Sequence, residues 1–287
     1  MPITVTPVTP VFCARLSGVD INKPLDEGVF KAIRAALDEH LILIFSGQPM
    51  TDEQQIEFSE RFGPLEGTDK DGVNPGAGTP FARQSNLDAT TGKVIPADDR
   101  RMFYQKANML WHADSTFKPI PSLCSVLTAR IVPTDAGATE FASTRAAYAS
   151  LNESEKTEIE DLMIEHDFAH SRSLVGFSFR AEELAGRAPV RHRLVRTNKA
   201  TGLKSVMIGA HAKCVVGWPE DESRALLDDL LARATREENT YRHEWLAGDA
   251  IVWDNQAAMH RATEYDTAHH QRLMQRTTIS SGNAAVN

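Results

Sequence analysis

The spacing of apolar residues predicts a helix, a buried strand and a second helix near the start of the chain. Apolar side chains recur at helical spacing from about 26 to 40, and a compact apolar run follows at 41–45. Thr51 with Gln54 has the form of a capping box, in which each residue's side chain bonds the other's backbone N–H. The next helix therefore begins here, and Gly63 predicts its end.

The middle of the chain alternates between strand and helix patterns. The run 123–132 has the composition of a strand, and the turn residues 134–137 direct the chain into a second strand at 139–141. A helix follows, and the residues at 152–155 have the form of another capping box. This box predicts a helical stretch that reaches about His166.

Strand patterns dominate the last hundred residues. One amphipathic helix is expected at 220–236, where leucines recur at helical spacing. Strands are expected at 192–197, 204–209, 239–245, 249–253 and 272–279. Many strands without regular βαβ alternation favour an antiparallel barrel or sandwich with helices packed around it.

The segment 67–101 has a different composition. It is rich in Gly, Pro, Asp, Asn and Thr, which predicts a long irregular loop. A loop of this length in a compact domain usually serves as a lid or is mobile. Lys70 and Arg83 are cations in this loop that would suit an anionic ligand, although a solvated surface position is the favoured interpretation for both.

Composition narrows the class of protein. The chain has 287 residues, of which 41% are hydrophobic, so it can bury a sizeable core as a single domain, 1–287. The net charge of -8 argues against binding nucleic acid or an anionic membrane, since both call for a basic surface. We therefore expect a small-molecule partner.

The cysteines and the N-terminus point to a reducing compartment. The three cysteines, at 13, 124 and 214, lack metal-site spacing and fit packing roles better than a disulfide framework. The first residues contain no basic segment leading into an apolar run, and no stretch approaches the length of a membrane span. The expected location is the cytoplasm.

A histidine and an aspartate two residues apart form the first candidate for chemistry. On an extended segment, His112 and Asp114 project from the same face. His260 follows a predicted strand and turn, so we expect it near a strand end. Two imidazoles and one carboxylate hold non-haem ferrous iron on one face and leave other coordination positions open. A His-x-Asp pair also occurs on solvated surfaces, so other residues must support this interpretation.

Two arginines supply that support. Arg272 and Arg276 are four apart on a predicted strand, so their side chains are expected on the same face. A buried guanidinium is costly without an anionic partner. Ligands that carry carboxylates would provide such partners.

With these motifs the chain resembles the ferrous iron and 2-oxoglutarate-dependent dioxygenases of the taurine dioxygenase type (TauD/TfdA family). Within that family it looks closest to the 2,4-dichlorophenoxyacetate (aryloxyalkanoate) dioxygenase branch. The resemblance rests on LIFSGQ at 43–48, FGPLE at 62–66, NMLWHADSTF at 108–117, GATEF at 137–141, RAAY at 145–148, IGAHA at 208–212, YRHEW at 241–245, VWDN at 252–255 and HR at 260–261. Between Glu66 and Asn108 little of the branch pattern can be aligned.

The resemblance implies a fold and a set of site residues. The fold is mainly β with α: a double-stranded β-helix, or cupin-like jelly roll, with surrounding helices. His112, Asp114 and His260 match the iron ligands. Arg272 matches the arginine that binds the distal carboxylate of 2-oxoglutarate, and Thr139 matches a threonine that hydrogen-bonds the same group. An arginine fork pairs bidentately with a carboxylate, in agreement with that role.

Three residues are weaker candidates for substrate binding. Arg276 matches an arginine that meets the acidic head of the primary substrate or the inner end of the cosubstrate. Asn108 aligns with a residue that contacts substrate in the taurine branch, although asparagine is also common in turns. His211 is positioned to line the substrate pocket, or else it is a structural histidine at a strand end.

The resemblance also implies the reaction. Fe(II), 2-oxoglutarate and O2 would hydroxylate a small anionic substrate and release succinate and CO2. In an aryloxyalkanoate such as 2,4-dichlorophenoxyacetate, the product would collapse to a phenol and glyoxylate. Taurine, another alkylsulfonate or another small carboxylate are alternative substrates, and homo-oligomers are common in such families.

A different class remains open: a metal-binding jelly roll without oxygenase activity, or a zinc hydrolase on the same ligands. Arg272 with Thr139 discriminates between these classes, because a hydrolase needs no clamp for a cosubstrate carboxylate.

Overall fold

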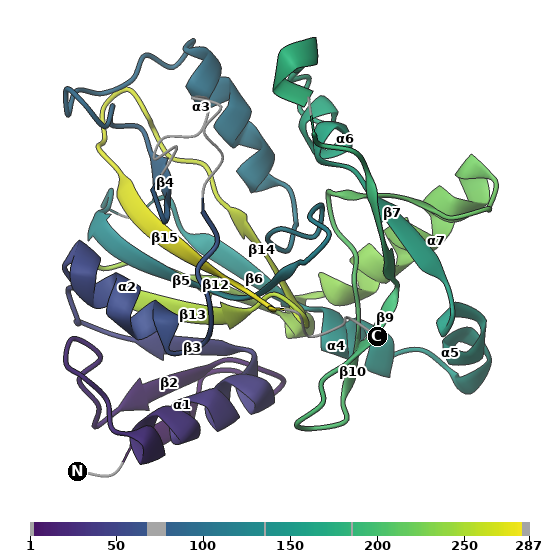
Figure 1. The fold of residues 1–287 in the computed structure, drawn as a ribbon, viewed down its shortest axis with the longest axis horizontal. Helices are drawn as coiled ribbons and strands as arrows, with labels where there is room; N and C mark the ends of the chain where they lie inside the picture. Colours follow the sequence, from purple (N-terminus) through teal and green to yellow (C-terminus); the bar gives the residue numbers. More distant parts are fainter. Residues whose placement is uncertain (1–2, 68–78, 135, 185, 283–287) are drawn as a thin grey trace.

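A seven-stranded sheet forms the largest layer of the protein (Figure 1). The computed structural model describes residues 3–67, 79–134, 136–184 and 186–282. All pairings in this sheet are antiparallel except that of β2 with β3. In spatial order its strands are β1 (Thr4–Pro7), β2 (Ala14–Ser17), β3 (Ile42–Phe45), β13 (Ala250–Asp254), β5 (Ser122–Ile131), β15 (Leu273–Ser280) and β4 (Phe81–Ser85).

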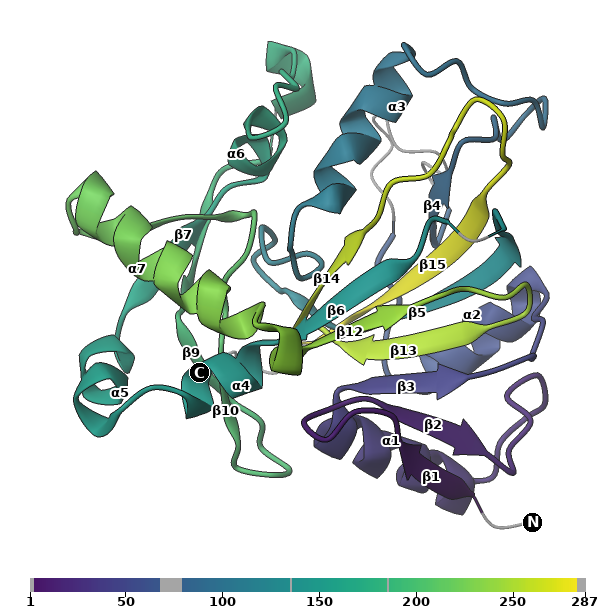
Figure 2. The ribbon, with the colours of Figure 1, turned by 180° about the vertical axis from the view of Figure 1, so that it is seen from behind.

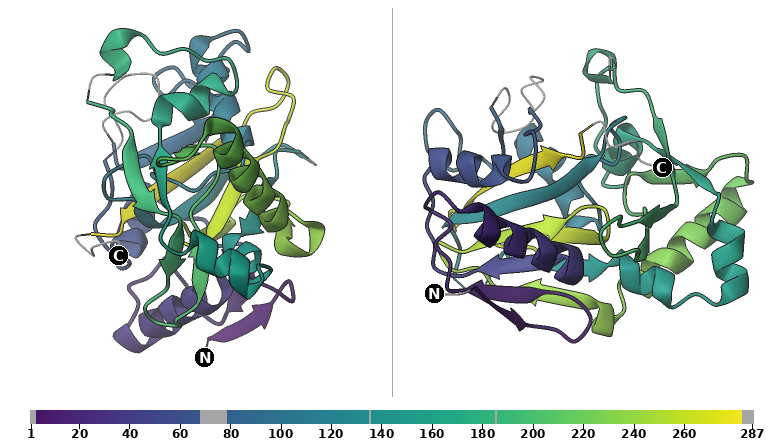
Figure 3. Two further views of the ribbon diagram at one scale, coloured as in Figure 1. Left: turned by 90° about the vertical axis from the view of Figure 1, so that its right-hand side faces the viewer. Right: turned by 60° about the horizontal axis from the view of Figure 1, so that its bottom comes forward.

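Two helices cover this sheet and bury its apolar side chains. Helix α1 (Glu27–His40) contacts β3 and β13, and α2 (Asp52–Glu60) contacts β5 and β15. In the right-hand view of Figure 3, α1 (purple) lies along the N-terminal strands. The capping box of Thr51 and Gln54 is present at the start of α2, as predicted.

A three-stranded sheet forms a second layer and contains His260 on its strand β14 (Ala258–Ala262). Its order is β12 (Thr240–His243), β6 (Thr139–Ser143) and β14. In its register, Thr139 lies opposite His243 and Ala262, and Phe141 lies opposite His260. The protein therefore has a mixed α/β fold with several sheets.

Smaller sheets and helices complete the described fold (Figure 2). One sheet has the order β11 (Ala212–Val215), β7 (Met163–His166) and β8 (Val190–Arg193), and β9 (Val195–Thr197) pairs with β10 (Lys204–Val206). The helices are α3 (Arg100–Gln105), α4 (Thr144–Ala149), α5 (Glu153–Ile159), α6 (Phe168–Ser173) and α7 (Glu220–Ala234), with short 3-10 helices η1 (Lys106–Met109), η2 (Ala181–Leu184) and η3 (Glu237–Asn239).

Several predicted elements are confirmed, and others are wrong in instructive ways. The helix expected to reach His166 ends at Ile159, and 163–166 form β7, in which exposure alternates with the two-residue period of a strand. The loop expected at 67–101 contains β4, which pairs with β15 from the far end of the chain. Part of that loop, 68–78 with Lys70, lies outside the described residues.

His260 is also placed differently from the prediction. It lies in the middle of β14 and not just beyond a strand, because the short run 258–262 pairs with β6. The predicted strand at 192–197 is divided at Leu194 into β8 and β9. All three cysteines are free, as predicted. Within the described ranges, no helix is long and apolar enough to cross a membrane.

Candidate active site

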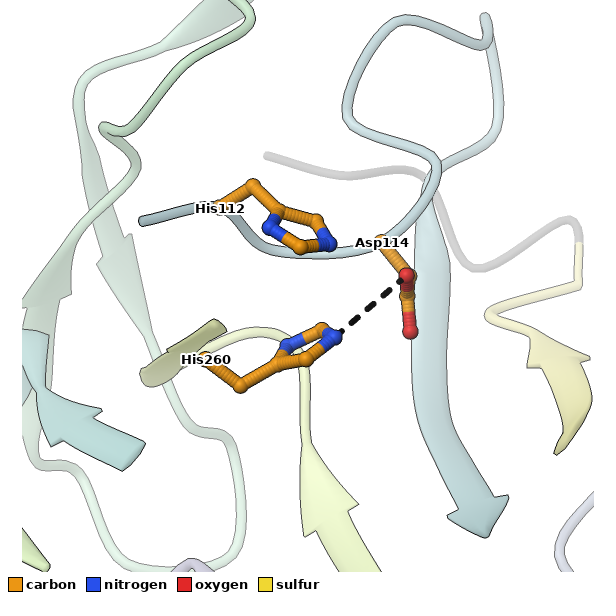
Figure 4. Close-up of side chains that lie close together, drawn as sticks. All are labelled: His112, Asp114 and His260. Atoms are coloured by element: carbon orange, nitrogen blue, oxygen red, sulfur yellow. Dashed lines mark ion pairs between the residues drawn. The ribbon is translucent and has the colours of Figure 1, made fainter. Parts of the chain in front are cut away.

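Two histidines far apart in the sequence are paired directly through their backbones. His112 N donates to His260 O at 3.1 Å, and His260 N donates to His112 O at 2.8 Å. Two residues that exchange both hydrogen bonds across an antiparallel bridge project their side chains to the same side. The ring centroids are accordingly 4.3 Å apart (Figure 4).

Asp114 is held beside these rings by a buried polar network. Its Oδ2 accepts a hydrogen bond from Ser125 Oγ at 2.7 Å, and its backbone N donates to Asn255 Oδ1 at 3.1 Å. Asn255 Nδ2 donates in turn to Ser125 Oγ at 2.9 Å, and Trp253 Nε1 donates to Asn255 Oδ1 at 2.9 Å. The VWDN segment thus orients the carboxylate, although no sequence pattern assigned it this role.

Burial and charge give the three side chains the protonation states that bind a metal. Burial lowers the pKa of His112 to about 4, against the opposing effect of Asp114, and burial also lowers the pKa of His260 well below its usual value. Burial acts to raise the pKa of Asp114, but Arg276 and the two histidines outweigh it and lower that pKa. At neutral pH the imidazoles are neutral and the carboxylate is ionised, as metal ligands must be.

The geometry of the three side chains fits a metal ion. One donor atom from each of His112, Asp114 and His260 lies within 4.8 Å of the others. His112 Nδ1 donates to Leu110 O at 2.7 Å, which leaves Nε2 with the lone pair for a metal. His260 Nε2 is buried without a hydrogen-bond partner among the described residues and lies 3.8 Å from Asp114 Oδ1 (Figure 4). This arrangement defines the class of two-histidine, one-carboxylate metal sites.

A cavity opens beside this group of ligands. Arg276 from β15 reaches into it and forms an ion pair with Asp114, with Nη1 2.6 Å from Oδ1. Asn108 and His211, both expected near the substrate, line the same cavity. The other lining residues are Glu66, Gly67, Pro80, Ala82, Arg83, Gln84, Tyr104, Gln105, His112, Asp114, Ser115, Phe117, Lys118, Phe168, Arg172 and Thr278.

A second cavity adjoins the first and contains Arg272. Gln84, Gln105 and Asn108 line both cavities, so they mark the junction between them. Arg272 is buried and donates to Gln84 O at 3.2 Å and to Gly137 O at 3.3 Å. Burial lowers its pKa to about 10, so the guanidinium is still a cation at neutral pH.

Arg272 has no carboxylate within 4 Å in the part of the chain that the structure describes. Its Nε has no hydrogen-bond partner there. Thr139 is also buried, but it does not line either cavity; its hydroxyl oxygen accepts a hydrogen bond from Trp245 Nε1 at 2.9 Å. It lies two positions after Gly137, whose carbonyl oxygen accepts a hydrogen bond from Arg272.

The sequence interpretation missed the residues that close the first cavity on its aromatic side. Tyr104 and Phe168 line this side, and the guanidinium of Arg172 lies over both rings. Arg172 and Phe168 share the short helix α6, which was not predicted. Six residues are too few for a periodic pattern, and the N-cap aspartate, Asp167, was the one sequence signal that could have marked this element.

Comparisons with known proteins show which family this chain resembles. The family model "Taurine catabolism dioxygenase TauD, TfdA family" matches residues 4–278. The chain is 37% identical to the alpha-ketoglutarate-dependent 2,4-dichlorophenoxyacetate dioxygenase of Cupriavidus pinatubonensis, over 97% of this chain and 98% of that one. It is 34% identical to a (S)-phenoxypropionate/alpha-ketoglutarate-dioxygenase of Sphingobium herbicidovorans, over 98% of this chain and 96% of the relative.

A solved structure extends the likeness to three dimensions. The crystal structure of AAD-2 in complex with Mn(II) and N-oxalylglycine has a TM-score of 0.91 and 38% sequence identity, with all of both chains covered. The chain belongs to the TauD/TfdA family of dioxygenases.

Gly209 sets how closely the segment before β11 approaches His112. Its φ is +114°, and a Cβ added there would lie 2.9 Å from Trp111 O and 3.1 Å from His112 Cα. We therefore expect Gly209→Ala to displace His112 and to weaken Mn(II) binding about 10- to 100-fold, the usual effect of disturbing a ligand's support. Titration of Mn(II), with the free ion followed by electron paramagnetic resonance, measures this change.

Gly202→Ala is the matched control. Gly202 also has a positive φ, +72°, but an added Cβ would meet nothing within 4 Å. Its Mn(II) affinity should equal that of the wild type. Equal affinity in Gly209→Ala would show that the close contact does not position the ligand.

Proposed function

We propose that this protein is a dioxygenase dependent on Fe(II) and 2-oxoglutarate that hydroxylates an aryloxyalkanoate such as 2,4-dichlorophenoxyacetate. One oxygen atom of O2 would enter the substrate and the other would enter succinate, with loss of CO2 from 2-oxoglutarate. The hydroxylated ether carbon is a hemiacetal, so it would break into a phenol and glyoxylate. The observation that carries the proposal is a buried His/Asp/His group together with a buried arginine in the adjoining cavity that has no anionic partner among the described residues.

His112, Asp114 and His260 would hold the ferrous ion. The neutral imidazoles, the ionised carboxylate and the free Nε2 of His260 support this role. When bound, Fe(II) supplies the redox chemistry that joins the decarboxylation of 2-oxoglutarate to the oxidation of a substrate C–H bond. Ser125 and Asn255 would hold the carboxylate in one orientation throughout.

Arg272 would bind the distal carboxylate of 2-oxoglutarate. Its burial is costly without an anion, and a bidentate carboxylate would supply one. Thr139 would add a hydrogen bond to the same group: its oxygen accepts from Trp245, so its own hydroxyl hydrogen can be donated. The junction residues Gln84 and Asn108 line both cavities, which suits a cosubstrate that extends from Arg272 toward the metal ligands.

The first cavity would hold the primary substrate. Arg276, Asn108 and His211 line it and are the predicted substrate contacts. Arg276 is paired with Asp114, so it would contact the substrate while it keeps its ion pair with the Asp114 carboxylate. The walls formed by Tyr104 and Phe168 would exclude water and pack against an aromatic ring.

We infer that the seven-stranded and three-stranded sheets form a jelly-roll core, since the segment that leads into β5 of the first sheet pairs through His112 with His260 on β14 of the second. The family model spans 4–278, which supports a single dioxygenase domain. Association into a homo-oligomer stays a prediction.

Other functions remain as alternatives. Taurine or another alkylsulfonate would also offer an anion to the cationic cavity, and the family description names taurine catabolism. A metal-binding protein without oxygenase activity and a zinc hydrolase would both leave the Arg272 cation unexplained, so we favour the dioxygenase.

A substrate panel tests the proposed function. Phenoxyacetates and phenoxypropionates should give succinate and the corresponding phenol in equal amounts when Fe(II), 2-oxoglutarate and O2 are present. Taurine, other alkylsulfonates and plain carboxylates serve as comparisons. Turnover of taurine without turnover of any phenoxy acid would overturn the aryloxyalkanoate assignment, and the absence of succinate with every compound would overturn the oxygenase assignment.

The cosubstrate clamp has its own test. Arg272→Ala should raise the KM for 2-oxoglutarate about 10- to 100-fold, because it removes hydrogen bonds from a cation to a carboxylate. Arg272→Lys retains the charge without the planar fork, so its KM for 2-oxoglutarate should lie between those of Arg272→Ala and the wild type. Steady-state kinetics at saturating phenoxy acid measures the change. An unchanged KM in Arg272→Ala would remove this residue from the cosubstrate site.

A further inference from the structure

Arg172 is a buried cation in the wall of the metal cavity. It lies on α6 and is 8% exposed. Its guanidinium carbon is 4.7 Å from the centroid of the Tyr104 ring and 4.8 Å from that of Phe168. Both rings line the same cavity as His112 and Asp114. The aromatic faces hold the guanidinium in place and partly offset the cost of its burial.

These aromatic contacts do not neutralise the charge. Arg172 Nη1 donates to Ser171 Oγ at 3.0 Å, and Nε is buried without a hydrogen-bond partner in the described structure. In the same described ranges, no carboxylate lies within 4 Å of its guanidinium. Leaving a buried cation unpaired is unfavourable, so the position calls for an anion that the described residues do not provide.

The other cations of this cavity differ from Arg172. Arg276 is paired with Asp114 at 2.6 Å, and Lys118 is paired with Glu66 at 2.7 Å. Arg83 is only partly buried and can stay hydrated. Arg172 is therefore the cavity cation whose burial most needs an incoming anion.

His211 provides a hydrogen-bonding group in the same cavity as Arg172 and His112. Its Nδ1 is 3.2 Å from Thr116 Oγ1, and its Nε2 is buried without a partner among the described residues. The centroid of its ring is 6.1 Å from that of His112. When Thr116 donates to Nδ1, Nε2 carries the hydrogen and can donate to a ligand.

We propose that Arg172 binds the carboxylate of the primary substrate, with His211 Nε2–H as a second donor. The planar fork of an arginine matches a carboxylate, and the nearby metal ligands place the carbon next to that carboxylate within reach of oxidation. The aryl ring of the substrate packs against the aromatic wall. This assignment rests on the proposed function and specifies which residue selects an acid.

If Arg172 only packs against the aromatic rings, its loss should affect acid binding no more than the loss of another cation on the same ring. Arg187 is that other cation. Its guanidinium carbon also lies over the Phe168 ring, 4.7 Å from the centroid, but Arg187 does not line the metal cavity. Arg172→Met and Arg187→Met each remove one cation from that ring and retain an apolar side chain of similar length. Only the first variant removes the proposed receptor for the acid.

Direct binding of an acid and its amide tests the proposal. Phenoxyacetate and phenoxyacetamide are titrated by calorimetry into the protein, both without added metal and with Mn(II). The wild type should prefer the acid, Arg172→Met should lose about 10- to 100-fold in affinity for the acid alone, and Arg187→Met should match the wild type. Arg172→Lys should recover part of the preference for the acid.

The outcomes separate this inference from the proposed function. An acid-over-amide preference that survives in Arg172→Met, or that falls equally in Arg187→Met, overturns the role of Arg172 even if the wild type oxidises phenoxy acids. Arg172-dependent binding of phenoxyacetate supports the role even if no succinate is ever formed. Arg172→Gln replaces Arg172→Met if circular dichroism shows that the methionine variant is unfolded.

Discussion

The antiparallel bridge between His112 and His260 is the constraint on which the site depends. Its two backbone hydrogen bonds join the segment before β5 to the middle of β14, and they place two imidazoles side by side. Asp114 follows two residues later and is fixed by Ser125 on β5 and by Asn255 just after β13. Backbone pairing thus holds the three side chains in place before a metal binds. Metal binding would therefore cost little further conformational entropy.

Buried charge explains why the cavities around this bridge suit two organic acids. Arg272 in the second cavity and Arg172 in the first are both buried without a carboxylate within 4 Å among the described residues. Arg276 is neutralised by the metal carboxylate itself. A site with one cation for each of two carboxylates fits a reaction that needs a keto acid and an acidic substrate together. The two cations would hold the keto acid and the substrate acid in positions where both lie beside the His/Asp/His group.

Local patterns predicted local structure, and they failed where a partner lay far away in the chain. The capping box of Thr51 and Gln54 uses neighbouring residues only, and the structure contains it. Strand β4 and the pairing of His260 depend on partners contributed by β15 and β6, so their own short sequences gave no signal. The spacing of His112 and Asp114 did predict two residues of the His/Asp/His group, because both come from one segment. Arg172 could not be found in this way, since only the tertiary fold brings α6 to the metal cavity.

The central claim is that the His/Asp/His group and Arg272 together bind iron and a keto acid. Absorption spectroscopy under anaerobic conditions tests it most directly, with Fe(II) and 2-oxoglutarate added separately and then together. The wild type should develop the visible charge-transfer band of an iron-chelated keto acid only when both are present, and His260→Ala should not develop it. The absence of this band in folded wild-type protein at saturating Fe(II) and 2-oxoglutarate would contradict the account.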